Sequence, residues 1–439
     1  MDTINSLKER LLKNKAFGPE NTADNYGVYS VCSAHPAVLK ASMRQAAEDG
    51  SFLVIESTSN QVNQYGGYTG MIPREFMRQV LAIASGVEFP GERIIFGGDH
   101  LGPGVWRSEN AAVAMEKAGA LIKAYAEAGY LKLHLDASMF CADDGGERTG
   151  ALPDEIAAKR AAKLCEIAEK TCCSSNGKNK PLYIIGTEVP VPGGAHAHEA
   201  VRPSSRESVL ATIEITRQAF YGAGLEEAWE RVIAVVAQPG VEFGNDHVFY
   251  YDHEKAKDLG CALDNGPMVF EAHSTDYQTG KGLAEMVRDH FAILKVGPWL
   301  TYAFREALFS LAHIENQLRK KNPRSNLEET LEEVMLGSIP NYWEKYYRGT
   351  EKEKAFARKY SFSDRCRYYW TDKRLSDCIG VLFRNLSEKP IPLSLLSQFM
   401  PDLFMQVCEG TVKNSPEDLV TARIQKVLAL YAGACGFRS

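Results

Sequence analysis

The chain has 439 residues, of which 45% are hydrophobic and 24% are charged, and its formal net charge is −6. This length allows a large buried core and exceeds one average domain. The acidic balance argues against nucleic acid or an anionic membrane as the main partner, and the absence of about eighteen consecutive uncharged apolar residues argues against a membrane span.

The cysteines and the first residues indicate the compartment. Ten cysteines are present without a C-x-x-C pair, and the opening residues MDTINSLKERLLKN predict a short charged helix rather than a secretion signal. A long chain with these properties is expected to be reduced and cytoplasmic.

Strand-like apolar runs alternate with helical patterns through the first two thirds of the chain. Eight strands are predicted, over 27–32, 52–57, 93–98, 131–136, 182–187, 232–237, 267–271 and 291–296. Helical periodicity between them is clearest at 109–128, 154–172 and 205–223. Continuous apolar strands joined by crossover helices predict a parallel sheet, and eight such units favour an α/β TIM barrel over a doubly wound open sheet. The barrel and its N-terminal helix are expected to span residues 1–316.

The remaining residues, 317–439, have a different character. They begin with a charged linker, LRKKNPRSN, and continue with amphipathic helical patterns such as NLEETLEEVMLG and PEDLVTARIQKVLALYAG. Aromatic loops, IPNYWEKYYRG and RCRYYW, lie between the helical patterns. This part is predicted to be a helical extension packed on the barrel.

Polar side chains follow most of the predicted strands at their carboxyl ends, where a TIM barrel carries its chemistry. Asp99 and His100 follow the third strand in IIFGGDHLGPG, and His134 and Asp136 end the fourth. The later strands are followed by Glu188, Gln238, Glu271, His273, Asp276 and Lys295. Since alternate strands share layers at the barrel mouth, these side chains are expected to converge.

Two imidazoles and a carboxylate follow the third, fifth and seventh strands, which suits a catalytic divalent metal. The expected ligands are His100, Glu188 and His273. Asp99 is the candidate proton-transfer group, and Asp136 and Glu271 are further candidate catalytic carboxylates. The alternative is a polar network at the barrel top without a metal.

A phosphorylated substrate would need hydrogen-bond donors. Gly297 precedes a predicted helix, where free backbone N–H groups attract anions. The other candidate substrate-binding residues are Ser59, Asn60, His134, Gln238, Asp276 and Lys295. No G-x-x-x-x-G-K-[ST] motif occurs, so a P-loop kinase has no support.

Long stretches around these residues resemble one known family. They are YSVCSAHPAVLKA, IESTSNQVNQYGGYTGM, GGDHLGP, HLDASM, IGTEVPVPGG, QPGVEF, EAHSTDYQT, RDHFAILKVGPWLTYAFREALF and YSFSDRCRYYW. On these motifs the chain is identified as a member of the GatZ/KbaZ family, the Z subunits of class II D-tagatose-1,6-bisphosphate aldolase.

The resemblance implies a relationship to the catalytic class II aldolases, which are zinc TIM barrels. Asp99 and His100 resemble their Asp-His pair, and His273 is similar to their third ligand. Glu188 stands where their second ligand is a histidine, which changes the charge around the metal and its preference. The implied cofactor is therefore a divalent metal ion, with zinc first and manganese, cobalt or nickel as alternatives.

The resemblance implies two functions in tagatose and galactitol catabolism. One is a 4-epimerase that interconverts D-tagatose 6-phosphate and D-fructose 6-phosphate by retro-aldol cleavage and re-formation of the C3–C4 bond. The other is a non-catalytic, chaperone-like subunit that activates a class II aldolase catalytic subunit. The expected partners are thus a phosphorylated ketohexose or that aldolase subunit, and self-association into a homo-oligomer stays open.

Overall fold

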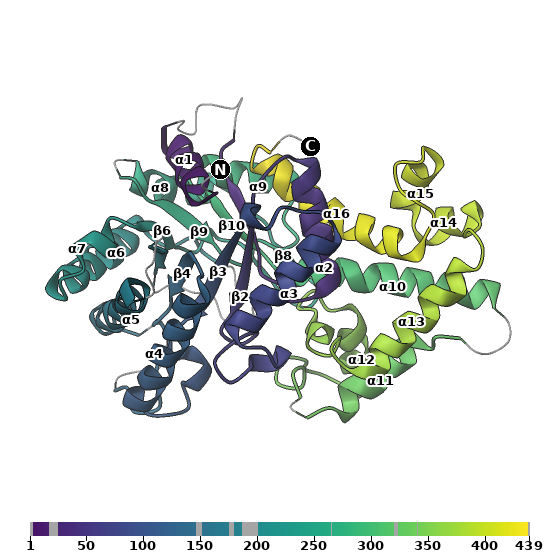
Figure 1. Cartoon of the computed structure of the whole chain (residues 1–439), viewed down its shortest axis with the longest axis horizontal. Coiled ribbons are helices and arrows are strands. Elements are labelled where there is room, and N and C mark those ends of the chain that lie inside the picture. Colours follow the sequence, from purple (N-terminus) through teal and green to yellow (C-terminus); the bar gives the residue numbers. More distant parts are fainter. Residues whose placement is uncertain are drawn as a thin grey trace.

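The computed structural model describes residues 3–16, 25–145, 152–174, 180–186, 201–264, 266–319, 324–339 and 341–437. Eight parallel strands close into a barrel in the order β1-β10-β9-β6-β5-β4-β3-β2 (Figure 1). Their bounds are β1 Val28–Val31, β2 Leu53–Thr58, β3 Ile94–Leu101, β4 Lys132–Leu135, β5 Leu182–Ile185, β6 Val232–Val236, β9 Val269–Ala272 and β10 Ile293–Val296. The predicted TIM barrel is confirmed, and closure rules out the open sheet.

Helices surround the barrel and connect its strands. They are α2 Pro36–Glu48, α3 Pro73–Gly86, α4 Ala111–Ala128, α5 Asp154–Ser174, α6 Arg206–Gly222, α7 Glu226–Trp229, α8 His253–Gly260, α9 Gly280–Arg288 and α10 Pro298–Leu318. Short 3₁₀ turns are η1 Gly67–Thr69, η2 Gly91–Arg93, η3 Pro103–Trp106 and η4 Cys261–Leu263. A hairpin of β7 Glu242–Phe243 and β8 Val248–Phe249 follows β6. Strands of two residues are too short to give an alternating pattern, which is why the hairpin was not predicted.

The N-terminal helix closes one end of the barrel. This helix, α1 Thr3–Ala16, buries Ile4, Leu7 and Leu11 in one cluster with residues that begin the barrel strands. The helix therefore covers the amino ends of the strands and leaves the carboxyl ends for chemistry.

Alternate residues of each strand point into the barrel and form layers. The layer next to α1 is apolar and includes Val28, Val54, Ile95, Val269 and Ile293. A charged layer comes next and contains Glu56, Lys132, Glu271 and Lys295. His134 lies two residues after Lys132, and His273 lies two residues after Glu271, just past the end of β9. Both imidazoles therefore stand closer to the barrel mouth than the charged layer. The interior thus changes from apolar to charged to imidazole-rich toward the mouth.

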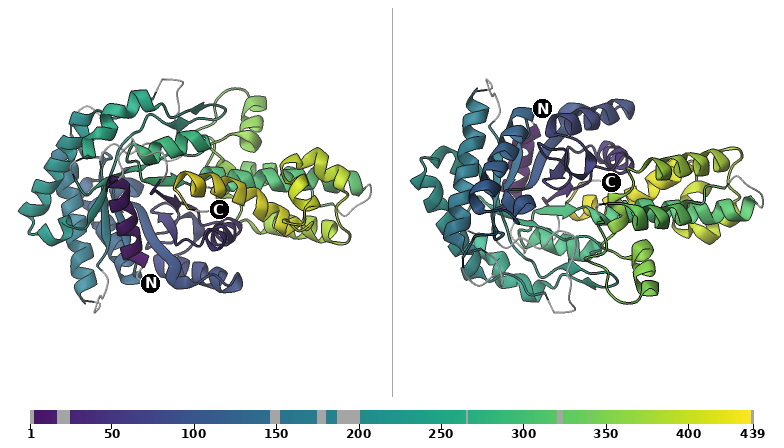
Figure 2. Two further views of the ribbon diagram at one scale, coloured as in Figure 1. Left: turned by 90° about the horizontal axis from the view of Figure 1, so that it is seen from above. Right: turned by 90° about the horizontal axis from the view of Figure 1, so that it is seen from below.

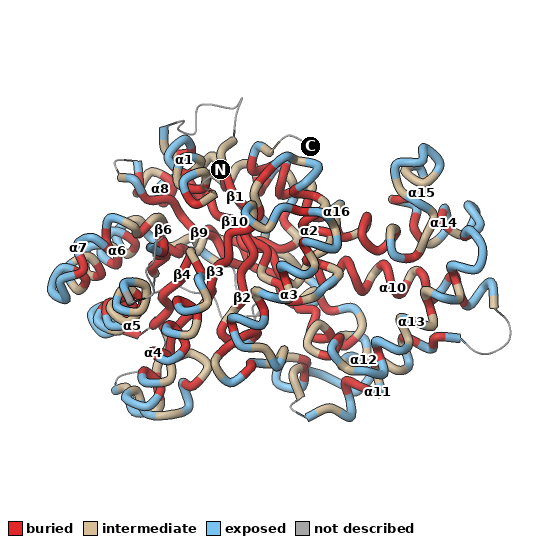
Figure 3. The backbone as a smooth tube through the Cα atoms, in the orientation of Figure 1, coloured by how far each residue is buried: buried red, intermediate tan, exposed pale blue. Residues whose placement is uncertain are grey.

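The rest of the chain forms a helical extension to one side of the barrel (Figure 2). Its elements are α11 Leu327–Gly337, α12 Glu351–Tyr360, η5 Arg365–Tyr368, α13 Lys373–Ser387, α14 Leu393–Phe399, α15 Pro401–Cys408 and α16 Pro416–Ala434. Helix α16 returns to the barrel and packs against α2, α9 and α10. Buried residues of α10 and α16 (Figure 3) belong to the same hydrophobic cluster as residues of the barrel, so barrel and extension share one core.

Among the described residues, no helix is long and apolar enough to cross a bilayer.

The aromatic loops of the extension contribute to its core. Trp343, Tyr347, Tyr369 and Trp370 are buried, and Tyr342, Tyr346 and Tyr368 pack against the same cluster. These side chains therefore stabilise the extension and do not form an exposed docking face.

Candidate active site at the barrel mouth

The end of β3 carries a local distortion that directs two polar side chains inward. The register of β3 against β4 shifts between Gly98 and Leu101, as in a β-bulge. His100 within this bulge has a φ of 50°, a left-handed conformation that is uncommon outside glycine. Backbone strain of this kind concentrates at functional sites, where the surrounding structure supports it. The distortion places Asp99 and His100 together at the mouth.

The glycines before this pair leave space for neighbouring groups. A Cβ atom on Gly97 would lie 2.6 Å from Cγ of Glu56, and one on Gly102 would lie 1.6 Å from the carbonyl oxygen of Asp136. Real Cβ atoms do not approach other atoms so closely. The glycine pattern of IIFGGDHLGPG therefore serves the packing of two carboxylate residues around the site.

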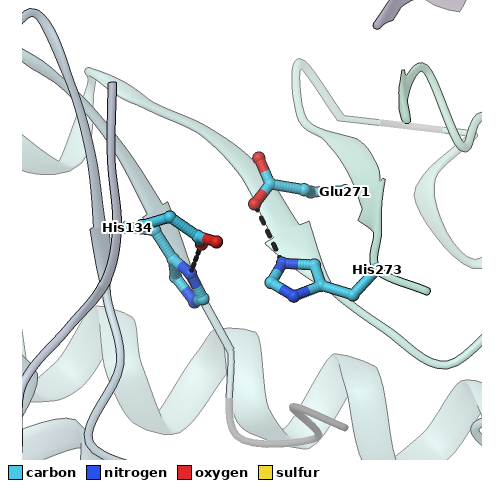
Figure 4. A group of neighbouring side chains, drawn as sticks. His134, Glu271 and His273 are labelled. Carbon is cyan, nitrogen blue, oxygen red and sulfur yellow. Dashed lines mark hydrogen bonds and ion pairs between the residues drawn. The ribbon is translucent and has the colours of Figure 1, made fainter. Parts of the chain in front are cut away.

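Three imidazoles meet inside the mouth. The ring centroids of His100 and His273 are 4.9 Å apart, and each lies 5.3 Å from that of His134. Figure 4 shows His134 and His273 facing each other beside Glu271, whose Oε1 is 3.1 Å from Nε2 of His273. Burial lowers the pKa of His273 to about 4, so this imidazole is neutral at physiological pH.

Asp99 is the centre of the hydrogen bonds at the mouth. Its Oδ1 accepts from the backbone N–H of His100 at 3.0 Å, and lies 2.9 Å from Nδ1 of His134 and 2.7 Å from Nζ of Lys295. Burial alone would raise the pKa of Asp99, but the charges of His100 and Lys295 hold it well below its usual value. Asp99 is therefore an ionised acceptor whose Oδ2 has fewer partners than Oδ1.

His100 is oriented by a second carboxylate. Its Nδ1 lies 2.8 Å from Oδ2 of Asp136, and its Nε2 lies 3.6 Å from Oδ2 of Asp99. Burial would lower the pKa of His100, but Asp99 and Asp136 raise it above the usual value. Asp136 in turn accepts from the hydroxyl of Ser138 at 2.6 Å, which fixes its position. A carboxylate behind an imidazole sets the tautomer and the orientation of the ring, for a metal ligand or for an acid/base group.

Below the imidazoles lies a buried network of two lysines and two glutamates. Nζ of Lys132 is 2.6 Å from Oε1 of Glu56 and 2.6 Å from Oε2 of Glu271. Nζ of Lys295 is 2.5 Å from Oε2 of Glu56 and also pairs with Asp99. Burial would raise the pKa of Glu271, but both lysines hold it well below its usual value. Lys295 is thus part of an ion network and does not stand alone as a cation for substrate.

The residues at the mouth fit a divalent metal ion. Asp99, His134, Glu271 and His273 each offer a ligand atom, and these atoms lie within 4.8 Å of one another. Nε2 of His134 is buried and has no hydrogen-bond partner among the described residues. Four carboxylates, Glu56, Asp99, Asp136 and Glu271, face two ammonium groups, Lys132 and Lys295, and the imidazole of His100, so negative charge is in excess even when His100 is protonated. A bound cation would offset this buried negative charge.

A cavity of about 120 Å³ opens above these groups. Of the predicted site residues, the cavity wall contains Asn60, Asp99, His100, His273, Asp276, Lys295 and Gly297. His134, Asp136 and Glu271 lie directly behind the wall, in contact with Asp99, His100 and His273. The convergence expected from the strand ends is therefore present for these ten residues.

Three predicted residues are placed elsewhere or not described. Ser59 is buried, and its backbone N–H donates to the carbonyl of Asp99 at 3.1 Å, so it supports the site from behind. Gln238 uses its side-chain oxygen to accept from the backbone of Gly240 and Val241. Glu188 lies outside the described residues, and its role as a metal ligand stays a prediction.

The N-terminus of α10 at Gly297 is expected to bind an anion with free backbone N–H groups, but in the structure these groups already have a partner. Oδ1 of Asp276 accepts from the backbone N–H groups of Gly297 at 3.0 Å and of Trp299 at 2.8 Å. Burial raises the pKa of Asp276 to about 6. A carboxylate of the chain itself therefore occupies the position at this helix N-terminus that an anion would take.

Several residues of the site were missed in the sequence. Glu56 and Lys132 lie at inward-facing positions of predicted strands, and the alternation within LVIES and LKLHLD could have identified them. Tyr68, Arg367 and Tyr368 also line the cavity. The last two come from the extension, and no pattern in the sequence connects them with the barrel mouth.

The carboxyl of Glu242, in the β7–β8 hairpin beside the cavity, is expected to make the free energy of unfolding depend on pH. Burial raises the pKa of its carboxyl to about 7, above the value of the unfolded chain. Its contribution to stability is therefore fully present below the unfolded value of 4.5, and is lost as the pH rises from there through about 7. Glu242→Gln is expected to raise the free energy of unfolding relative to wild type by up to about 3 kcal/mol near pH 9, with little difference near pH 5.

Urea unfolding at the two pH values would measure this difference. Glu116 in α4 is exposed, and Glu116→Gln serves as the matched control with no expected pH-dependent gain. An equal gain for Glu242→Gln at both pH values would contradict the assignment.

Comparison with known proteins assigns the chain to a family. Residues 14–436 match the family described as D-tagatose-1,6-bisphosphate aldolase subunit GatZ/KbaZ-like. A solved structure described as a probable tagatose 6 phosphate kinase from Sinorhizobium meliloti 1021 is 44% identical, with a TM-score of 0.84, and the match covers 93% of this chain and 100% of that chain. The fructuronate-tagaturonate epimerase UxaE from Cohnella laeviribosi is 12% identical, with a TM-score of 0.46 and coverage of 96% and 84%. The second similarity is too low to bear on function.

Proposed function

The chain belongs to the GatZ/KbaZ-like family of D-tagatose-1,6-bisphosphate aldolase subunits, and we propose that it is itself an enzyme. The proposed reaction is the interconversion of D-tagatose 6-phosphate and D-fructose 6-phosphate by epimerisation at C4. The observation that carries this proposal is a set of groups in and directly behind the wall of one cavity: an ionised Asp99, an oriented His100, and a donor set with an unpartnered imidazole nitrogen.

The two sugars differ only in the configuration of C4, which is not adjacent to the C2 carbonyl. Direct removal of the C4 proton is therefore unfavourable, whereas cleavage of the C3–C4 bond is an ordinary retro-aldol step. The electron pair of that bond moves toward the C2 carbonyl, and the C4 hydroxyl loses its proton as C4 becomes an aldehyde. The aldehyde rotates, the C3–C4 bond re-forms on its other face, and the proton returns to the new C4 oxygen, so that only the configuration of C4 is inverted.

Asp99 is the proposed proton acceptor for the C4 hydroxyl. Three donors engage its Oδ1, which leaves Oδ2, toward Nε2 of His100, as the oxygen for the transfer. His100, held by Asp136, would hydrogen-bond the same hydroxyl and orient it. His134, Glu271 and His273, beside Asp99, would hold the metal ion, which supplies Lewis-acid polarisation of the C2 carbonyl when bound.

The second candidate function is that of an accessory subunit, because the family description names an aldolase subunit. In that case the chain would bind a class II aldolase catalytic subunit without turnover of its own. The solved relative is described as a probable kinase, and a P-loop kinase has no support in this chain because the sequence has no P-loop motif.

An assay of the chain alone separates the two candidates. The purified chain is incubated with D-tagatose 6-phosphate, and D-fructose 6-phosphate is followed by a coupled assay before and after dialysis against a chelator. We expect turnover that chelation abolishes and that zinc, manganese, cobalt or nickel restores. Absence of turnover with every one of these metals, together with activation of an aldolase catalytic subunit, would establish the accessory role.

A further inference from the structure

The extension contributes an arginine to the wall of the active-site cavity. Helix η5 places Arg367 and Tyr368 in the same wall as Asp99 and His100, although they are more than 260 residues apart in the chain. Asp364 fixes this segment to α10, since its carboxylate accepts from the hydroxyl of Thr301 at 2.5 Å and from Nε of Arg305 at 3.3 Å. The position of Arg367 is therefore set by the fold.

Arg367 has hydrogen bonds but no carboxylate partner. Its guanidinium donates to the backbone carbonyls of Ser363 and Asp364 and, at 2.9 Å, to the hydroxyl of Tyr368. Within the described part of the chain, no carboxylate oxygen lies within ion-pair distance of it, whereas the nearby Arg358 pairs with Glu332. A partly buried guanidinium with no carboxylate at ion-pair distance can still accept an anionic ligand as its direct partner.

A second guanidinium reinforces the positive charge at this point. Nη1 of Arg365 lies 3.5 Å from the hydroxyl of Tyr368, and its guanidinium stacks on Tyr346 with 3.3 Å between Cζ and the ring centroid. Burial would raise the pKa of Tyr368, but Arg367 and Arg365 lower it below the usual value. The lowered pKa of the Tyr368 phenol therefore indicates a positive electrostatic potential at this side of the cavity.

The other groups that could hold a phosphate are already engaged. The helix N-terminus at Gly297 is capped by Asp276. Lys295, the other cation in the cavity wall, pairs with Glu56 and Asp99. Among the residues described for this wall, Arg367 is thus the permanently charged cation that an incoming phosphate could reach without displacing a carboxylate.

There is also room beside Arg367. A second cavity of about 400 Å³ adjoins the first, and the two share Cys32, Gln61, Tyr68, Gly297 and Arg367 in their walls. A chain of carbon atoms could therefore run from the imidazole cluster to the guanidinium.

We propose that Arg367 binds the phosphate group of the substrate, so that the extension completes the substrate site of the barrel. The phosphorylated end lies at Arg367, and the carbonyl and C4 lie at the imidazole cluster. The assignment of the two ends rests on the proposed function, but the binding of phosphate by Arg367 does not. Its planar guanidinium suits bidentate contact with phosphate oxygens.

Isothermal titration calorimetry with inorganic phosphate, D-fructose 6-phosphate and D-fructose tests this assignment in the full chain. We expect both phosphate-containing probes to bind the wild type and D-fructose to bind at least tenfold more weakly. Arg367→Gln should weaken binding of inorganic phosphate at least tenfold. Arg374→Gln should leave it unchanged, because Arg374 is an exposed arginine of the same extension paired with Asp372.

A second variant keeps the test decisive if Arg367→Gln does not fold. Asn60 is an exposed residue of the cavity wall, and Asn60→Asp adds a negative charge without a change in size. This variant is expected to weaken phosphate binding by repulsion. Wild-type affinity for phosphate in folded Arg367→Gln or in Asn60→Asp, or no binding by the wild type, would overturn the assignment. The calorimetry does not depend on turnover. A chain that binds phosphate through Arg367 but shows no epimerase activity in the separate assay would therefore refute the proposed function and leave the phosphate assignment intact.

Discussion

Asp99→Asn is expected to lower kcat/KM for D-tagatose 6-phosphate by about a hundredfold to ten-thousandfold, or roughly 3–5 kcal/mol of transition-state stabilisation. The side chain keeps its shape and can still accept from the backbone N–H of His100. It can no longer take a proton as a carboxylate, and it loses its charge interaction with Lys295. Coupled-assay kinetics on the isolated chain would measure the effect.

The metal content of the variant must be measured in parallel, because Asp99 also belongs to the metal donor set. Asp246→Asn is the matched control, since Asp246 is an exposed aspartate of the β7–β8 hairpin. It should retain wild-type kinetics. If metal-loaded Asp99→Asn turns over at the wild-type rate, Asp99 is not the proton acceptor.

Lys132→Met is expected to lower the free energy of unfolding by about 3–5 kcal/mol. Lys132 is 1% exposed and stands between Glu56 and Glu271, each 2.6 Å from its ammonium nitrogen. Methionine has a similar length but leaves two buried carboxylates with less counter-charge. Urea unfolding, followed by circular dichroism, would give the change.

The cost should decrease when one of the two buried carboxylates that lose their partner is also neutralised. Lys132→Met combined with Glu56→Gln is expected to be less destabilising than the sum of the two single substitutions, because the residues interact directly. Lys123→Met, at a side chain that is 62% exposed, should cost below about 1 kcal/mol. A similarly small cost for Lys132→Met would show that the buried network does not stabilise the fold.

The barrel could be predicted from the sequence because its signal is local. Each strand is a short apolar run between helical patterns, and eight repeats suffice to infer closure. All eight strands are predicted within three residues of their observed ends, and the polar residues at the carboxyl ends of β3, β4 and β9 converge as expected. Parallel strands share one carboxyl edge, so position along a strand determines which side chains meet.

The remaining features depend on contacts between distant segments. The capping of Gly297 by Asp276 joins two strand ends through side-chain geometry that no spacing specifies. The contribution of Arg367 requires the extension to return to the mouth, and Asp364 secures that path through contacts with α10. The double role of Asp99, between His134 and Lys295, likewise became apparent only in three dimensions.

The central claim is that this chain alone inverts C4 by cleaving and re-forming the C3–C4 bond. D-tagatose 6-phosphate carrying deuterium at C4, incubated with the purified metal-loaded chain in ordinary water, tests this claim directly by nuclear magnetic resonance of the product. The account predicts D-fructose 6-phosphate that retains deuterium at C4, because the C4–H bond never breaks in a retro-aldol route. Product that has exchanged this deuterium for hydrogen, or no product at all, would contradict the account.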